Sequence, residues 1–464
     1  MEQITLKYEN LDTEPYIVNS PASMHGGILY KKFSENFLHY NDKRIKISQV
    51  IDGIFNYIRQ TEDPVDSHES YIVESINDIN DKKYILPIAV ATNPTDWADL
   101  DIYGKLVESK KSIFEIISPL AIKDLQNEKA LLLIDQSIEG YHQLWLWDWF
   151  HKKCQHYNIN PKTIIYMTGD QDSIVKYDKW AAENNVSAKL KVIPSITLSS
   201  YIRISYEDNE LDMKFDELLE YKKNNTSTIY LYDCLNLRPR PQRVLNFLHL
   251  LNADLLKYGN VSMSDQSEWY GYLDITQAEF LASYKLPIDI LNKLNSTEVT
   301  LLNNYSNLGE IKEYHIFYER ILHNLYKNSW VSIVTESSYF SYEHSIFVSE
   351  KTFKPIACMQ PFIIVGSRDT LKYLRKLGYK TFHPFIDESY DDLDDQHRLP
   401  AIMEALKKVQ SIEDKVSWYS SMREIVEHNH KLFMLINKTK SLEHQELTKY
   451  YFEFIKETDV QTAQ

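Results

Sequence analysis

The chain has 464 residues, of which 43% are hydrophobic and 25% are charged, and its net charge is −15. This length exceeds that of one ordinary folding unit, so we expect two domains. The composition is typical of a water-soluble globular protein, and the acidic balance disfavours a protein that mainly coats nucleic acid. No window approaches eighteen consecutive apolar residues, which predicts that the chain does not cross a membrane.

The N-terminus and the cysteines bear on location. The first residues contain no basic stretch followed by an apolar run, so we expect no signal peptide. Cys154, Cys234 and Cys358 are scattered, and their spacing indicates neither a disulfide framework nor a zinc site. These features predict a cytoplasmic protein that holds no structural metal.

The first 204 residues contain two textures. Residues 1–80 are mixed in character, and we expect an irregular N-terminal extension with one helix near residues 47–60. In residues 81–204, short apolar runs alternate with helical patterns, which predicts a parallel sheet covered on both faces, as in a Rossmann-like domain. The predicted strands are 84–91, 130–134, 163–167 and 188–194, and the predicted helices are 141–157 and 173–184.

A second α/β region follows a polar segment. Residues 205–227 are charged and polar, and we expect a linker there. The alternation restarts in residues 228–400, which predicts a second Rossmann-like domain, and residues 401–464 have a purely helical pattern. The predicted strands are 228–232, 330–335 and 361–365, and the predicted helices are 241–257, 315–327, 350–359 and 370–377. The predicted fold class is therefore α/β with two Rossmann-like lobes and a C-terminal helical tail.

The strongest local signal is a helix start that follows the strand 330–335. Ser349 has the residue type of an N-cap, which places Glu350 and Lys351 in the first helical turn. A carboxylate suits that end of the helix dipole and a lysine does not, so Lys351 and the nearby Lys354 indicate an anionic partner such as phosphate. Glu350 has the chemistry to accept hydrogen bonds from ribose hydroxyls. The alternative is a solvated helix start with an ordinary salt bridge.

This segment resembles the donor-binding motif of the α-1,3-fucosyltransferases. In that family a strand ending in Phe-Glu-Asn-Ser precedes a Thr-Glu-Lys helix, and the next strand begins with proline. Here Glu336, Ser337 and Ser338 stand in place of Glu-Asn-Ser, and Ser349, Glu350 and Lys351 in place of Thr-Glu-Lys. The resemblance implies that Glu350 binds the ribose or sugar of a nucleotide sugar, and that Lys351 binds its diphosphate.

The chain also resembles a group of uncharacterised virus- and phage-encoded glycosyltransferases over residues 228–410. Their Ser-Glu-Lys-Thr-Phe-Lys-Pro helix is followed by a segment similar to residues 374–382 and by an acidic loop similar to residues 387–391. The two-lobed pattern matches the GT-B arrangement of glycosyltransferases, which many other α/β enzymes share.

Arginines follow the strand 228–232. Arg238, Arg240 and Arg243 lie in a loop and helix start at the carboxyl end of that strand, where Rossmann-like domains bind ligands. The planar guanidinium binds phosphate oxygens bidentately, so we interpret these residues as a diphosphate clamp, with Arg243 as the strongest candidate. A basic surface loop paired with acidic neighbours is the alternative.

A transferase that inverts its sugar needs a group to take the acceptor proton. In the first domain the candidates for this catalytic role are Asp135, Glu139, Asp96 and Asp170, and His25 in the N-terminal extension is a further option. The nearby aromatic residues have the chemistry to stack on a sugar or base, although helical spacing more often indicates core: Tyr141, His142, Trp145, Trp147 and Trp149.

A metal-dependent GT-A enzyme is the structural alternative. Such enzymes hold a divalent cation on an Asp-X-Asp motif, and the triplet 170–172 is the one of three such triplets that follows a clear strand. The favoured function remains a metal-independent glycosyltransferase that needs no cofactor beyond a nucleotide-diphosphate sugar as donor and acts on a glycan, protein or modified-DNA acceptor. A DNA-modifying phage enzyme and a non-catalytic nucleotide- or sugar-binding protein are the functional alternatives.

Overall fold

The structure is a computed structural model, and it divides the chain into two units, Met1–Leu198 with Thr439–Gln464 and Ser199–Lys438. Each unit is built around one parallel sheet. The structure describes residues 4–8, 71–75, 83–90, 94–101, 103–137, 139–140, 142–196, 199, 202, 206, 211–236, 240–262, 321, 323–341, 345–436 and 442–462.

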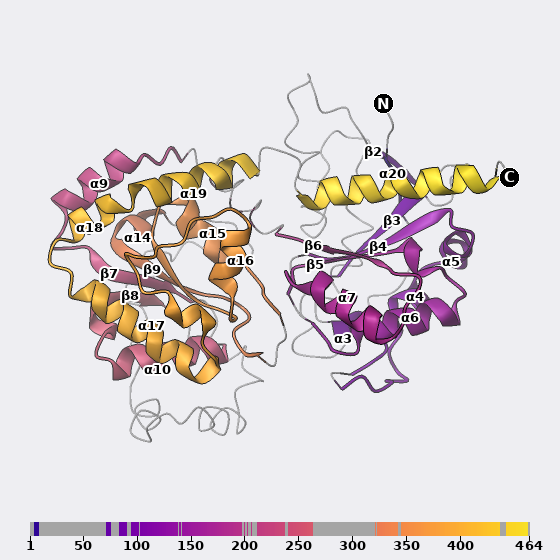
Figure 1. The fold of residues 1–464 in the computed structure, drawn as a ribbon, viewed down its shortest axis with the longest axis horizontal. Coiled ribbons are helices and arrows are strands. Elements are labelled where there is room, and N and C mark those ends of the chain that lie inside the picture. The colour runs from indigo at the N-terminus through magenta and orange to yellow at the C-terminus, as the bar shows by residue number, and fades with distance from the viewer. Residues whose placement is uncertain are drawn as a thin grey trace. The chain divides into compact units, whose positions relative to one another are not determined.

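The sheet of unit 1 has six described strands in the order β2-β1-β3-β4-β5-β6, and all of its pairings are parallel (Figure 1). The strands are β1 Ile4–Tyr8, β2 Tyr71–Ser75, β3 Tyr84–Ala89, β4 Ala130–Gln136, β5 Ile164–Thr168 and β6 Lys191–Pro194. Every residue of β4 and β5 is buried, because their apolar runs lie in the middle of a sheet that is covered on both faces. The four strands predicted between residues 84 and 194 are confirmed.

The helices of unit 1 are α3 Pro94–Trp97, α4 Ile113–Ile116, α5 Pro119–Gln126, α6 Leu146–His156, α7 Ser173–Glu183 and α20 Leu442–Thr462, with the 3₁₀ turn η3 Pro161–Thr163. The C-terminal helix α20 returns to this unit. Its Tyr451 hydroxyl donates to the main-chain oxygen of Lys83 at 2.7 Å, and Lys191 pairs with its Glu446 at 2.7 Å. The last helix therefore belongs to the unit that contains the N-terminus.

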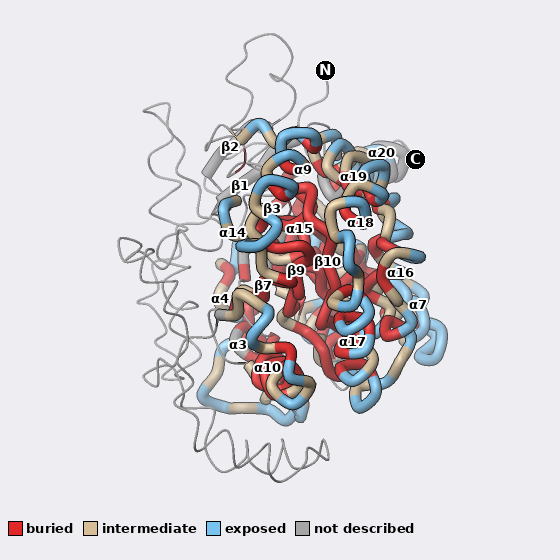
Figure 2. The backbone as a smooth tube through the Cα atoms, turned by 90° about the vertical axis from the view of Figure 1, so that its left-hand side faces the viewer, coloured by how far each residue is buried: buried red, intermediate tan, exposed pale blue. Residues whose placement is uncertain are grey.

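The sheet of unit 2 has four described strands in the order β10-β9-β7-β8, again all parallel. These are β7 Tyr230–Leu235, β8 Gly259–Ser262, β9 Ser329–Thr335 and β10 Phe362–Val365. The helices are α9 Phe215–Asn224, α10 Pro241–Asn252, α14 His323–Lys327, α15 Glu350–Ala357, α16 Thr370–Lys376, α17 Asp395–Gln410, α18 Lys415–Ser421 and α19 Arg423–Ile436, with the 3₁₀ turns η4 Leu256–Tyr258 and η8 Ser389–Asp392. Strands β9 and β10 and helix α15 are buried, whereas α16 and α17 have exposed outer faces (Figure 2).

Three predicted boundaries differ from the structure. Strands β1 and β2 lie within the predicted N-terminal extension 1–80 and belong to the first sheet. The predicted linker 205–227 contains α9 and lies in unit 2, because Phe215 and Leu218 bury one face of that helix. The predicted tail 401–464 is shared, since α17–α19 belong to unit 2 and α20 to unit 1. The helix predicted near residues 47–60 lies outside the described residues.

A buried lysine connects α9 to the amino end of β9. The Lys222 ammonium donates to the main-chain oxygen of Ser329 at 2.5 Å and lies over the rings of Trp330 and Tyr419, 5.4 and 4.9 Å from their centroids. Burial lowers the pKa of Lys222 to about 7, and the nearby Asp233 opposes this shift. Unit 2 therefore contains a titratable cation in its core.

Candidate functional site

The candidate site lies where the connections of the unit 2 sheet diverge. Strand β8 follows β7 and lies on one side of it, whereas β10 follows β9 and lies on the opposite side. The two central strands, β7 and β9, therefore send their connections in opposite directions, and this arrangement is a topological switch point. Ligands of open parallel sheets bind at the carboxyl ends of the strands at such a point. The helices that follow these two strands are α10 and α15.

Glu336 fixes the start of α15 to the end of β9. This fully buried carboxylate accepts hydrogen bonds from the main-chain nitrogen of Ser349 at 3.0 Å, from the Ser349 hydroxyl at 2.5 Å and from the Thr352 hydroxyl at 2.6 Å. The Ser349 side chain in turn accepts from the nitrogen of Lys351, as predicted for an N-cap. Both oxygens of Glu336 have partners within the protein, so its described contacts position α15.

Gln242 connects the start of α10 to the segment that follows β9. Its side-chain amide donates to the main-chain oxygens of Glu336 and Ser337 at 2.9 and 2.8 Å. Pro241 occupies the first turn of α10, where the missing N–H is not needed. The starts of α10 and α15 are therefore both held against the segment that follows β9.

Helix α15 begins with the carboxylate of Glu350, which interacts with the charges of Lys351 and Lys354. Lys351 contacts Glu350 at 2.8 Å and donates to the Ser349 hydroxyl at 3.1 Å. Burial by itself would raise the pKa of Glu350, but the charges of Lys351 and Lys354 outweigh it and lower the pKa to about 2. Burial lowers the pKa of Lys354 to about 8, Glu350 opposes that shift and Lys351 adds to it. Glu350 is therefore ionised at neutral pH.

Arg243 joins α10 to this group electrostatically. Only 5% of Arg243 is exposed, and burial lowers its pKa to about 10. Arg240 adds to the lowering, whereas the charges of Glu350 and Glu336 oppose it. One cluster of interacting charges thus spans the two helix starts. We call it the α10–α15 cluster and define it as Arg240, Arg243, Glu336, Glu350, Lys351 and Lys354.

The sequence-predicted donor residues fall into three groups. Arg240, Arg243, Glu350, Lys351 and Lys354 are in the cluster as charged groups. Ser349 and Glu336 have positioning contacts, and Ser337 offers its main-chain oxygen to Gln242. Arg238 lies outside the described residues.

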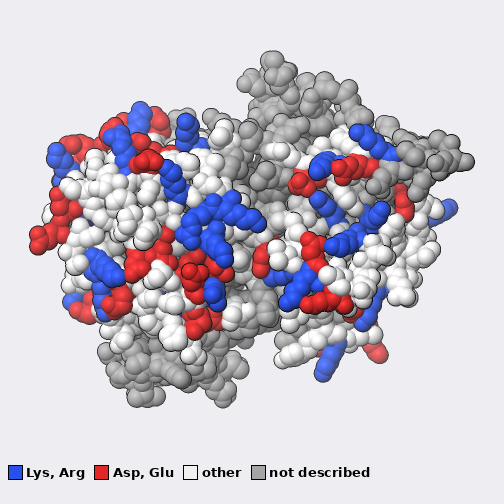
Figure 3. Space-filling model, viewed as in Figure 1, with Lys and Arg blue, Asp and Glu red and all other residues white. Residues whose placement is uncertain are grey.

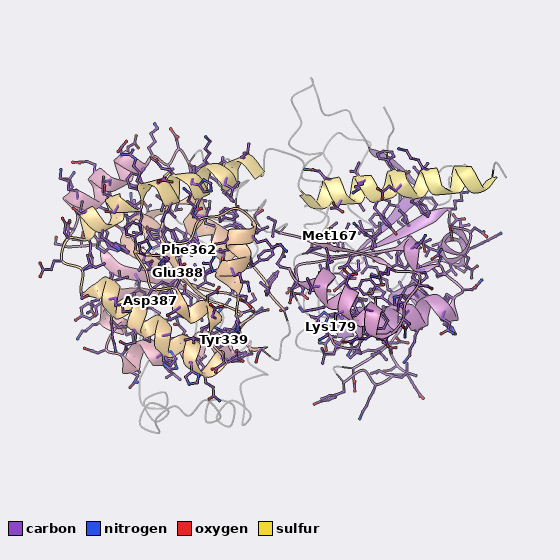
Figure 4. All side chains as sticks on the ribbon, viewed as in Figure 1. Met167, Lys179, Tyr339, Phe362, Asp387 and Glu388 are labelled. Atoms are coloured by element: carbon purple, nitrogen blue, oxygen red, sulfur yellow. The ribbon has the colours of Figure 1, made fainter. Side chains whose placement is uncertain are left out.

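Arg398 was not singled out from the sequence, yet it holds the loops around the cluster. This buried guanidinium donates to the main-chain oxygens of Tyr339 and Gly366, each at 2.9 Å, and lies 4.8 Å from the centroid of the Tyr339 ring. Tyr339 is labelled in Figure 4. It also donates to the main-chain oxygen of Leu393 at 2.9 Å. The segments that follow β9 and β10 are therefore fixed to α17. No local pattern signals this role, because two of these partners lie 59 and 32 residues away in the chain.

In unit 1 the structure brings one predicted catalytic residue close to a histidine. Asp170, 1% exposed, lies 2.7 Å from the ammonium of Lys176, and its carboxylate is 3.7 Å from Nδ1 of His142. Lys176 also contacts Asp172 at 2.5 Å. Burial raises the pKa of Asp170 well above its ordinary value, Asp172 adds to the rise and Lys176 opposes it. His142, predicted from the sequence only as a stacking residue, thus lies beside the charged group that follows β5.

The other candidates of unit 1 have mixed surroundings. The Asp135 carboxylate is buried and accepts from the nitrogen of Ser137 at 2.9 Å, which is a turn contact. Glu139 is partly exposed, and its main-chain oxygen accepts from Gly169 at 3.0 Å. Trp147 and Trp149 are core residues, in agreement with the structural alternative for them. Asp96 lies in α3, and His25 and Tyr141 lie outside the described residues.

The described part of the chain contains neither a candidate metal site nor a candidate membrane-spanning helix. Among these residues, no group of three or more His, Cys, Asp or Glu side chains is placed to hold a metal ion. Within the same residues, no helix combines the length and the apolar character needed to cross a bilayer. Comparisons of the chain with family models, with curated proteins and with solved structures found no match. The fold and the site define a two-unit parallel α/β protein with a charged cluster at the carboxyl edge of its second sheet.

Proposed function

We propose that this chain is a glycosyltransferase of the GT-B arrangement, and that the α10–α15 cluster binds the diphosphate of a nucleotide-sugar donor. One observation carries the proposal: the starts of α10 and α15 lie together at a topological switch point, and each helix start contributes cations to the cluster. Helix starts favour anions through their exposed N–H groups and their dipoles. The sequence resemblance around Glu350 and Lys351 supports the same assignment.

The charges of the cluster suit a dianion. It contains four cations and two carboxylates, which leaves a formal charge of two positive, although the whole chain carries −15. On the viewed face most exposed Lys and Arg lie among Asp and Glu, and one larger group of Lys and Arg lies together (Figure 3). The diphosphate of a nucleotide sugar is a dianion, and its two phosphates suit cations on two neighbouring helix starts. The net charge of the chain favours a glycan or protein acceptor over DNA.

The proposed chemistry assigns different roles to the cluster. The acceptor oxygen forms a bond to the anomeric carbon of the sugar, the bond between that carbon and the diphosphate oxygen breaks, and its electron pair stays on the diphosphate oxygen. Arg243 and Lys351 then stabilise the negative charge that develops on the leaving nucleoside diphosphate. Glu350, held ionised by its lysines, accepts hydrogen bonds from ribose hydroxyls. Glu336 and Gln242 keep the two helix starts in place.

In unit 1 we propose that Asp170 and His142 take the proton of the acceptor hydroxyl. Both follow strands of a parallel sheet at its carboxyl edge, and buried carboxylates with raised pKa values are typical of catalytic acids and bases. In the GT-A alternative Asp170 and Asp172 would bind a divalent cation. Lys176 contacts both carboxylates, which favours the metal-independent proposal.

A thermal-shift screen tests the proposal. Wild-type protein is heated with UDP, GDP, ADP, CMP and their common sugar conjugates, because tight binding to the folded state raises the melting temperature. We expect one nucleoside diphosphate and its sugar conjugate to raise it, and the conjugate to release free nucleoside diphosphate slowly. Binding without release would favour the non-catalytic alternative, and no shift with any of the compounds would contradict the proposed function.

A further inference from the structure

The segment after β10 passes beside the α10–α15 cluster. Val365 pairs with Thr335 in the sheet, and the nitrogen of Glu336 donates to the Val365 oxygen at 2.9 Å. A Cβ atom built on Gly366 would lie 3.4 Å from the Cβ of Glu336. Gly366 therefore lies against the residue whose carboxylate holds the start of α15.

Ser367, the next residue, is held firmly by its main chain. The Thr370 hydroxyl donates to the Ser367 oxygen at 2.5 Å, and Arg398 donates to the oxygen of Gly366 at 2.9 Å. These contacts fix the main chain on both sides of the Ser367 side chain. They do not use its hydroxyl.

The hydroxyl of Ser367 has no hydrogen-bond partner among the described residues. The residue is 8% exposed, and its Oγ atom is buried. A buried hydroxyl without a partner is unfavourable, and each such group in a protein requires an explanation, such as a bound ligand. Ser367 lies at the carboxyl edge of the sheet, directly after Gly366, which lies against Glu336.

We propose that the Ser367 hydroxyl hydrogen-bonds the bound donor at a polar group beyond its diphosphate. The inference rests on the proposed function. The cluster takes its cations from the segments that follow β7 and β9, and Ser367 follows β10, the next strand of the same sheet. When the diphosphate of the donor binds the cluster, the ribose or sugar attached to it extends over the end of β10. Hydroxyls of a ribose and of a transferred sugar have the same hydrogen-bonding chemistry, and the experiment separates them.

The test uses Ser367→Ala and three probes in titration calorimetry. The probes are inorganic pyrophosphate, the nucleoside diphosphate that binds wild type most tightly and the matching nucleotide sugar. We expect pyrophosphate affinity to stay within twofold of wild type. We expect the nucleotide sugar to bind about tenfold more weakly. An equal loss for the nucleoside diphosphate assigns the contact to the nucleoside, and a loss confined to the nucleotide sugar assigns it to the sugar.

Stability separates this role from a structural one. Because the wild-type hydroxyl has no partner among the described residues, Ser367→Ala should melt at the same temperature as wild type or higher. Ser332→Ala is the matched control, since that buried hydroxyl donates to Asp233 at 2.7 Å. The control should melt at a lower temperature and keep all three affinities.

Two results would overturn the inference. One is unchanged affinity of Ser367→Ala for all the probes that wild type binds, and the other is a lower melting temperature together with equal losses for all three probes. A wild-type protein that binds none of the probes would instead reject the proposed function, and this inference with it.

Discussion

The carboxylate of Glu336 accepts both the main-chain N–H and the hydroxyl of Ser349, at 3.0 and 2.5 Å. One side chain at the end of β9 thus binds the residue that caps α15. The capping serine uses its own oxygen for the nitrogen of Lys351. The direction in which α15 presents its first turn is therefore set by a contact between two segments that are 13 residues apart.

Glu336→Ala should destabilise unit 2 by on the order of 3 kcal/mol, because it leaves buried donors of Ser349 and Thr352 without an acceptor. Glu336→Gln should cost less, since its amide oxygen still accepts from two of these donors. Denaturant unfolding of the three proteins measures both effects. An alanine variant as stable as wild type would show that the contact does not fix the helix.

Glu350→Gln tests the role of the buried carboxylate in the cluster. Removing one negative charge next to Lys351 and Lys354 should make inorganic pyrophosphate bind more tightly, about two- to tenfold. The nucleoside diphosphate should lose affinity relative to pyrophosphate, because Gln is the weaker acceptor for ribose hydroxyls. Calorimetry with both ligands gives the ratio, and a ratio that stays at the wild-type value would argue against ribose recognition by Glu350.

The buried Lys222 predicts a pH dependence of stability. Its pKa is about 7 in the folded state and near 10.5 when unfolded, so the unfolded state binds more protons at pH values between these two. Stability from this group therefore rises with pH in that window, by up to about 1.4 kcal/mol per unit. The free energy of unfolding of wild type, minus that of Lys222→Met, should increase from pH 7 to pH 9.

The matched control for this series is Lys223→Met, which changes an exposed lysine of the same helix. The free energy of unfolding of wild type, minus that of Lys223→Met, should not change with pH. If the Lys222 difference is also flat, the buried ammonium keeps its proton throughout the range.

His142→Gln and Asp170→Asn test the acceptor side. If the pair takes the acceptor proton, each variant should slow release of nucleoside diphosphate from the donor by about 100-fold or more. Nucleotide affinity should stay within twofold, because the binding cluster is in the other unit. His156→Gln, an exposed histidine at the end of α6, is the control and should turn over like wild type. Normal turnover in both variants would move the proton acceptor elsewhere.

The sequence predicts those elements whose signals are local. The runs at β4, β5 and β9 are mostly apolar and contain at most one charged residue, and their burial in the sheet follows from that composition. Strands β1 and β2 were missed because charged residues interrupt such short runs, as at Lys7 and Glu74. The buried face of α9 is formed by Phe215 and Leu218 among charges, so its polar composition concealed a helix.

The candidate site was predictable to a similar degree. The N-cap Ser349 and the position of Arg243 at the start of α10 follow from residue type and spacing. The positioning role of Glu336 and the loop contacts of Arg398 depend on partners that only the fold brings together. A buried hydroxyl that finds no partner in the described part of the chain, such as that of Ser367, is a property of packing and has no sequence pattern.

The diphosphate site is tested most directly by the affinity of wild type, Lys351→Ala and Arg243→Ala for the nucleoside diphosphate found in the thermal-shift screen. Each substitution should weaken binding by about 10- to 100-fold, as expected for the loss of a charged hydrogen bond, with the fold retained. Lys372→Ala, which removes an exposed lysine paired with Asp369, should bind like wild type. Wild-type affinity in both Lys351→Ala and Arg243→Ala would contradict the assignment of a diphosphate site to the α10–α15 cluster.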